Sequence, residues 1–167
     1  MRGTSSSRSD VIPFAEEINA FLRAAHEQGV RLLLVGGGAV NFHGYQRQSA
    51  DVDLWIEPTR ENFDRLLIAL NTLGYAVERL PEAVLHSEQN ISIKASPDMD
   101  LELITRFDPG CSFEEAWSRR VSAELAGEPV SRFHVLHRDD LIASKLRAGR
   151  PRDLLDVQEL QRRGSRS

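Results

Sequence analysis

The chain has 167 residues, a length typical of one domain rather than two. Apolar residues make up 41% of the chain and charged residues 28%, which excludes a disordered chain, a collagen-like repeat and a coiled coil. The formal net charge of −4 gives no global attraction for nucleic acid, although a local basic patch remains compatible with it.

The sequence also bears on where the protein resides. No apolar run approaches the roughly 18 residues of a membrane span, and residues 1–10 lack the apolar centre of a secretory signal. We expect residues 1–10 to form a disordered tail and residues 11–164 to form a single domain. Because the one cysteine, Cys111, has no partner for an intrachain disulfide, we expect a cytoplasmic protein without membrane association.

Helical and strand patterns alternate along the chain. The pattern predicts helices over 12–28, 39–45, 59–74, 113–121, 139–148 and 151–163, and a turn or helix that begins at Pro81. It predicts strands over 32–35, 51–56, 75–78, 91–95 and 99–104, with weaker strand signals between 121 and 135 around Gly127. This order predicts an α/β (α+β) fold, in which helices pack on a small mixed β-sheet.

Two carboxylates mark the strand over 51–56. Asp51 and Asp53 alternate with apolar residues, so both should project from one face of the strand. Like charges placed side by side repel, and a divalent cation would compensate them, because Mg²⁺ prefers hard oxygen ligands. The alternative is that this face is solvated and that the aspartates only keep the strand soluble.

Three consecutive glycines follow the buried run over 32–35. Gly36, Gly37 and Gly38 permit positive φ angles and a close approach of the backbone to a ligand, and their N–H groups suit a phosphate. A tight turn between strand and helix without a ligand is the alternative. The chain has no G-x-x-x-x-G-K-[ST] loop, and Asn41 stands where the dinucleotide-binding fingerprint needs a third glycine.

A second pair of acids, Asp100 and Glu102, shares one face of the strand over 99–104. If this strand lies beside the strand over 51–56, a third carboxylate joins Asp51 and Asp53. Two divalent ions about 4 Å apart can clamp the attacking and leaving oxygens in phosphoryl transfer.

Together these segments resemble a known family. VGGGAVNFHGYQRQSADVDLWIE (35–57), the acids at 100 and 102, and LHRDDLIASKLRAGRPRDLLDVQEL (136–160) resemble the small prokaryotic nucleotidyltransferases of the DNA polymerase beta superfamily, of the minimal and the abortive-infection, toxin–antitoxin types. The resemblance covers roughly residues 31–160. It implies a nucleotidyltransferase-like fold and a metal-dependent transfer of a nucleoside monophosphate from a nucleoside triphosphate to an RNA or protein hydroxyl. The implied cofactor is Mg²⁺ or Mn²⁺, and the implied partners are the triphosphate and a tRNA acceptor or partner protein.

The resemblance also implies roles for individual residues. Asp51, Asp53 and Glu102 would be catalytic and bind the metals, with Asp100 as the rival of Glu102 for the third carboxylate. The nucleotide would be bound by Gly37, Gly38, Arg47, Ser49, Lys145 and Arg150. Arg150 and Asp153 would also support the C-terminal helix pair.

Some residues keep a second interpretation. Lys145 lies among apolar residues of a helix and could equally be a surface lysine. Trp55 shares the strand face of the acids, where it could stack on a base or pack in the core. Many active family members carry a serine where this chain has Gly38, and an aspartate where it has Glu102. The alternative function is therefore a non-catalytic, antitoxin-like binding protein on the same scaffold.

Overall fold

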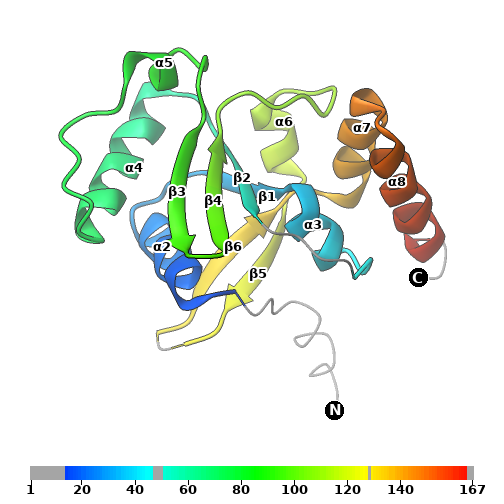
Figure 1. Ribbon diagram of the computed structural model, residues 1–167, viewed down its shortest axis with the longest axis horizontal. Helices are drawn as coiled ribbons and strands as arrows, with labels where there is room; N and C mark the ends of the chain where they lie inside the picture. The colour runs from blue at the N-terminus through cyan, green and yellow to red at the C-terminus, as the bar shows by residue number, and fades with distance from the viewer. Residues whose placement is uncertain (1–13, 47–50, 128, 165–167) are drawn as a thin grey trace.

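A computed structural model describes residues 14–46, 51–127 and 129–164. Its strands form one six-stranded mixed sheet in the order β3-β4-β2-β1-β6-β5 (Figure 1). The strands are β1 (Leu32–Val35), β2 (Val52–Ile56), β3 (Ile91–Ser96), β4 (Met99–Ile104), β5 (Val121–Leu125) and β6 (Ser131–Val135). The helices are α2 (Glu16–Glu27), α3 (Gly36–Phe42), α4 (Arg60–Thr72), α5 (Glu82–Leu85), α6 (Phe113–Ser118), α7 (Arg138–Ala148) and α8 (Pro151–Gly164). The expected small mixed sheet with packed helices is confirmed.

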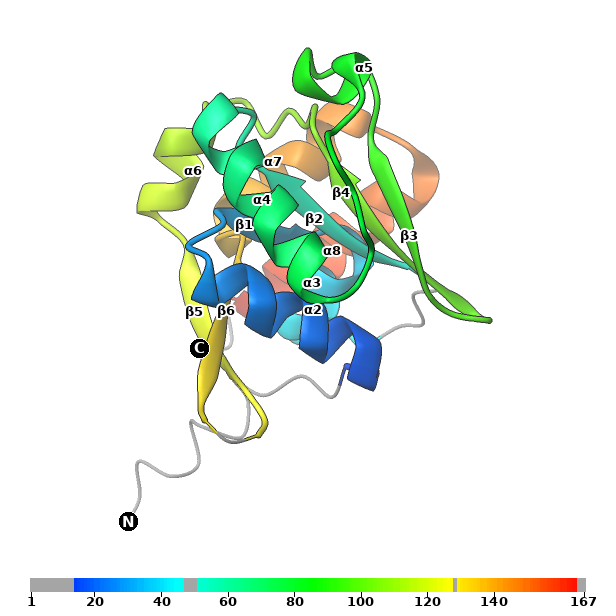
Figure 2. The same cartoon turned by 90° about the vertical axis from the view of Figure 1, so that its left-hand side faces the viewer.

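Helices cover both faces of the sheet. In Figure 2, α2 and α4 lie across one face, and α7 and α8 lie behind the other. β1 is therefore buried on both sides, which explains why its sequence Leu-Leu-Leu-Val is an uninterrupted apolar run. On the face covered by α2, Leu32 and Leu54 lie beside Leu22 and Ala25. The opposite face of the same strands is the one that can present polar residues toward α7 and α8.

The pairing of the strands places β2 at the centre of the acidic region. β2 runs antiparallel to β1 and parallel to β4, with Asp53 in register with Val35 on one side and Glu102 on the other. β3 then pairs antiparallel with β4 at the edge of the sheet, and β6 runs parallel to β1. The two acid-bearing strands are therefore neighbours, as the proposed third carboxylate requires.

Two elements differ from the sequence-based prediction. The helix expected to begin at Ala39 begins at Gly36, so the glycines form its first turn instead of a separate loop. The strand predicted over 75–78 is wrong. Asn71 donates to the carbonyl oxygen of Val77 at 2.8 Å and accepts from its N–H at 2.8 Å, and Ala76 has φ +52°. With both backbone groups of Val77 bonded to one side chain, the segment cannot join a ladder.

Several predictions fall outside the described residues. The expected tail over residues 1–10 lies there, as do Arg47 and Ser49. None of the described helices combines the length and the apolar character that crossing a bilayer requires.

Candidate active site

Asp53 and Glu102 form the centre of the candidate site. They are direct neighbours across the parallel pair β2 and β4, so their side chains leave the sheet on the same face. Both side chains are half-buried, whereas Asp51, two residues before Asp53, is exposed. The sequence could predict that each pair of acids shares a face, and the structure adds that the two strands are adjacent and in register.

The pKa of Asp53 reflects the neighbouring carboxylates and the burial of its side chain. Its pKa is raised above the ordinary value of 3.8, first by burial and then by the negative charges of Asp51 and Glu102. Lys145 and Arg152 act in the opposite direction but do not offset the rise. An ionised carboxylate held beside two others is a group that a divalent cation would stabilise.

Gly36 makes room for Asp53. It has φ +62°, a backbone conformation that residues with a side chain rarely adopt. A Cβ added there would lie 2.5 Å from Oδ2 of Asp53. The family resemblance implies nucleotide contacts for Gly37 and Gly38. In the structure, Gly37 is buried and Gly38 is half-buried. The first glycine of the triplet is thus the one whose missing side chain determines where the carboxylate lies.

Asp100 is in a different situation from Glu102. It faces Lys94 of the edge strand β3, and the carboxylate oxygen Oδ1 lies 3.2 Å from Nζ of that lysine. Glu102 faces Ser92 on that side and Asp53 on the other. The geometry therefore favours Glu102 over Asp100 as the third carboxylate, because Asp100 already has a cationic partner.

A cleft of about 440 Å³ opens over Asp53. Its volume falls within the range of about 300–1,000 Å³ that small-molecule sites occupy. It runs between the acidic face of the sheet, the segment that follows β4, and the α7–α8 pair. Its lining includes Val35, Gly36, Asp53, Ile104, Arg106, Phe107, Asp108, Ser144, Lys145, Arg147, Arg150 and Asp153.

The cations on the helical wall of this cleft are held by carboxylates. Nζ of Lys145 lies 3.0 Å from Asp156 and 3.6 Å from Asp153, and all three side chains are buried. Asp153 also accepts from Nε of Arg150 at 2.6 Å, and this hydrogen bond is the main reason that its pKa is lowered. Lys145 is therefore part of a buried ionic cluster that joins α7 to α8 and not a surface lysine.

Comparison with known families agrees with this geometry. A family model described as a nucleotidyltransferase of unknown function (DUF6036) matches residues 12–163. The chain belongs to this nucleotidyltransferase family. Among proteins of curated function, none matches the chain.

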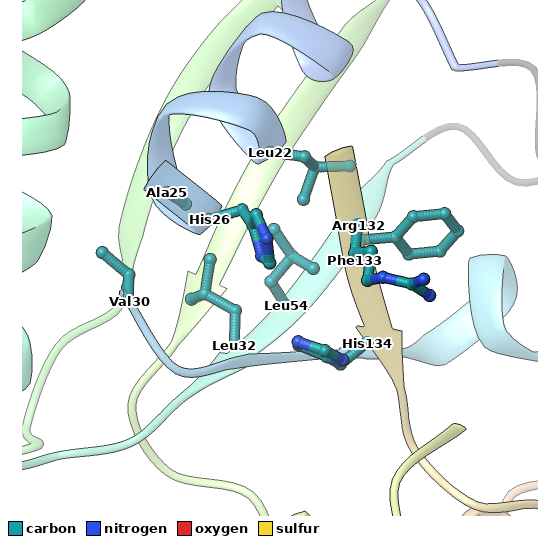
Figure 3. A pocket seen from close by; sticks show the side chains of 9 residues that line it. All are labelled: Leu22, Ala25, His26, Val30, Leu32, Leu54, Arg132, Phe133 and His134. Atoms are coloured by element: carbon teal, nitrogen blue, oxygen red, sulfur yellow. The ribbon is translucent and has the colours of Figure 1, made fainter. Parts of the chain in front are cut away.

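The other cavities fit a nucleotide less well. A cavity of about 20 Å³ between α2 and β6 has room for about one water molecule, and His26 and His134 lie at its rim (Figure 3). Burial, reinforced by Arg120, lowers the pKa of His134 to about 4, so this ring is neutral at pH 7. A groove of about 470 Å³ beside β3 is lined mainly by apolar side chains, and no carboxylate of the described chain lines it. A cavity of about 420 Å³ is lined by Arg138 and Asp139 of α7 and by residues of α8, but no residue of β2 or β4 lines it. The cleft over Asp53 differs from it in joining an acid of the sheet to several cations.

The acids in and beside the cleft could hold a divalent metal only together with oxygens from a ligand. Within 14–46, 51–127 and 129–164, no three histidine, cysteine, aspartate or glutamate side chains are arranged as a ready metal cage. Mg²⁺ is commonly held by one or two carboxylates together with substrate phosphates. Asp53 and Glu102, with Asp51 nearby, supply that smaller donor set, and the triphosphate would supply the remaining oxygens.

Trp55 packs in the core, which was the second of the two interpretations of this residue. Its side chain is 4% exposed, and its ring lies 5.0 Å from that of Phe107 and 4.8 Å from that of Phe113. It is thus a core residue that supports the wall of the cleft. Several cleft residues, among them Arg106, Asp108, Ser144 and Arg147, were not predicted from the sequence, and Gly36 was predicted only as one of the three glycines and not for its contact with Asp53. Gly36 had a signal, since it is the first glycine after a buried strand, whereas Arg106 had none.

Proposed function

We propose that this protein is a metal-dependent nucleotidyltransferase that moves a nucleoside monophosphate from a nucleoside triphosphate to an acceptor hydroxyl. The observation that carries the proposal is the register of Asp53 with Glu102 in β2 and β4, with Asp53 in the lining of a cleft of about 440 Å³. Family membership supports the same class of reaction.

The residues of the cleft would bind and orient the substrates. Asp53 and Glu102, assisted by Asp51, would hold Mg²⁺ or Mn²⁺, which neutralises charge on the phosphates when bound. The backbone N–H groups of Gly37 and Gly38, in the first turn of α3, are not used by hydrogen bonds within the helix and would face phosphate oxygens. Lys145 and Arg150 would add positive charge from the helical wall.

The proposed reaction forms one bond and breaks one. The acceptor oxygen attacks the α-phosphorus, the bond from this phosphorus to the oxygen that bridges it to the β-phosphorus breaks, and pyrophosphate leaves. The proton of the acceptor hydroxyl passes to water. Positioning and charge neutralisation would provide most of the rate enhancement, as in other phosphoryl transfers.

Labelling tests this proposal directly. Purified protein is incubated with Mg²⁺ and each α-³²P-labelled nucleoside triphosphate, in the presence of tRNA or of protein from a cell extract. We expect label in one of these acceptors with wild type and none with Asp53→Asn. Equal labelling by both proteins, or no labelling of any acceptor by wild type, would contradict the proposal.

We further propose that the transfer acts as the toxic activity of a toxin–antitoxin pair, as the resemblance to that type suggests. Induced expression of wild type would then slow the growth of the host cell, and Asp53→Asn would not. Equal growth of the two strains at matched protein levels would overturn this assignment and leave the enzymatic proposal in place.

A second candidate function is a binding protein that retains the scaffold without transfer. The buried contacts of Lys145 with Asp153 and Asp156 favour it, because they already neutralise that cation. This candidate predicts that Asp53→Asn still binds a partner protein from the native host and keeps the biological effect. Loss of the effect in Asp53→Asn would exclude it.

A further inference from the structure

Arg106 differs from the other cations of the cleft. Arg147 is paired with Asp108 at 2.8 Å, Arg150 with Asp153 at 2.6 Å, and Lys145 with two buried carboxylates. In the described parts of the chain, the guanidinium of Arg106 has neither an ion pair nor a hydrogen bond, although its residue is exposed and lines the cleft. It is therefore a cation of the cleft that remains available to a ligand.

The backbone on both sides of Arg106 is anchored. Thr105 is 3% exposed, its N–H donates to Asn90 at 3.0 Å, and its hydroxyl donates to the carbonyl oxygen of Gln89 at 3.1 Å. On the other side, Phe107 packs against Trp55 with ring centroids 5.0 Å apart. A side chain carried between two fixed residues is presented at a defined place, so binding through it costs little ordering of the backbone.

Arg106 lies close to the acids both along the chain and in the cleft. It follows Glu102 by four residues, so the two Cα atoms are separated by at most about 14 Å. Asp53 and Arg106 line the same cleft, and the nearest acid in sequence, Asp108, is already engaged by Arg147. A guanidinium presents paired N–H donors that fit phosphate oxygens, and it stays charged at all physiological pH values.

We propose that Arg106 binds the β- or γ-phosphate of the nucleoside triphosphate, which makes it a binding residue for the pyrophosphate leaving group. This inference rests on the proposed function for the identity of the ligand. The cleft is of nucleotide size and is lined by both Arg106 and Asp53, which favours the triphosphate over a phosphate of an RNA acceptor.

Binding to non-hydrolysable analogues tests this inference without turnover. Isothermal titration with Mg²⁺ and the α,β-methylene triphosphate of each nucleoside is compared with titration by the corresponding monophosphates, for wild type, Arg106→Gln and Arg106→Lys. Arg79→Gln is the matched control, because Arg79 is another exposed arginine without an ion pair in the described chain. Arg79 lies near α4 and α5 and does not line the candidate cleft.

We expect Arg106→Gln to bind the triphosphate analogue about 10- to 100-fold more weakly, the loss typical of a charge-assisted phosphate contact, and to bind the monophosphate as wild type does. Arg106→Lys would recover part of the affinity, and Arg79→Gln would match wild type. Unchanged triphosphate affinity in Arg106→Gln, or an equal loss for triphosphate and monophosphate, would overturn the inference.

The same titrations separate this inference from the proposed function. Wild type that binds the triphosphate through Arg106 but transfers no label would contradict the function and support the role of Arg106. Wild type that transfers label while Arg106→Gln keeps full triphosphate affinity would support the function and overturn the role of Arg106. Wild type without any triphosphate affinity would overturn both.

Discussion

The side chain of Asp53 occupies the space that a side chain at position 36 would need. A Cβ at position 36 would lie 2.5 Å from Oδ2 of Asp53 and 3.3 Å from its Cβ, so any side chain at position 36 would displace the carboxylate. The first residue of α3 thus limits where the side chain of an acid near the start of β2 can lie. The relationship explains why a glycine is needed there whether or not a ligand is bound.

Gly36→Ala should therefore abolish transfer while the protein still folds. The strain of a non-glycine residue at φ +62° would cost roughly 1–2 kcal/mol of folding free energy, and the displaced Asp53 would account for the loss of activity. Gly74→Ala is the matched control, since Gly74 has φ +93° but no atom within 4 Å of an added Cβ. Urea unfolding should show a similar loss of stability for both variants. The labelling assay should show a loss of transfer for Gly36→Ala alone. Full activity in Gly36→Ala would show that the position of Asp53 does not matter.

Asp53 should make stability depend on pH in a defined direction. Because its pKa is raised in the folded state, its contribution to stability is complete below the unfolded value of 3.8 and is lost as the pH rises through the folded pKa. Without metal, Asp53→Asn should therefore melt higher than wild type at pH 7.

The difference between Asp53→Asn and wild type should shrink toward pH 3, where the aspartate is protonated. Asp64→Asn is the control, since Asp64 is an exposed residue of α4 with only a weak contact to Arg60 at 3.8 Å. Mg²⁺ with a triphosphate analogue should raise the melting temperature of wild type and of Asp64→Asn but not that of Asp53→Asn. An Asp53→Asn protein that melts below wild type at pH 7 would mean that the acid is not under electrostatic strain.

Glu102 and Asp100 should differ sharply in their effect on activity. Glu102→Gln removes a carboxylate in register with Asp53, and we expect at least a roughly 100-fold fall in transfer rate, the scale of removing one preorganised charge from an active site. Asp100→Asn removes a partner of Lys94 on the edge strand, and the rate should change less than about threefold. Rate measurements at saturating Mg²⁺ compare the two. A larger loss in Asp100→Asn would make Asp100 the third carboxylate.

Lys145 should be important for folding as well as for binding. Lys145→Met leaves Asp153 and Asp156 buried beside each other without their shared cation, and removing one partner from a buried ionic group costs about 3–5 kcal/mol. Arg147→Met, which removes an exposed partner of Asp108, should cost less than about 1 kcal/mol. The free energy of unfolding in urea measures both. Equal, small losses would mean that the cluster between α7 and α8 contributes little.

The sequence was most informative where local chemistry determines the structure. The all-apolar run over 32–35 is a strand buried on both faces, and Thr59 begins α4 by accepting from the N–H of Asn62 at 3.3 Å. The alternation of acids and apolar residues over 99–104 predicted the shared face of Asp100 and Glu102, both of which lie within β4. These features depend on residues that are close in the chain, so their periodicity is sufficient.

Other features depend on contacts between distant segments. The residues of 75–78 have strand-forming character, but the side chain of Asn71 occupies both backbone groups of Val77. Nothing in the local pattern of β4 distinguishes Asp100 from Glu102, because the difference is set by Lys94 across one neighbouring strand and by Asp53 across the other. Arg106 likewise becomes notable only when the carboxylate partners of the other cleft cations are known.

The most direct test of the account is the location of manganese in crystals soaked with Mn²⁺ and an α,β-methylene nucleoside triphosphate. The anomalous signal of Mn²⁺ should lie between the carboxylates of Asp53 and Glu102, with the phosphates of the nucleotide in the cleft beside Gly36 and toward Arg106. Manganese and nucleotide bound elsewhere, with Asp53 and Glu102 contacting neither, would contradict it.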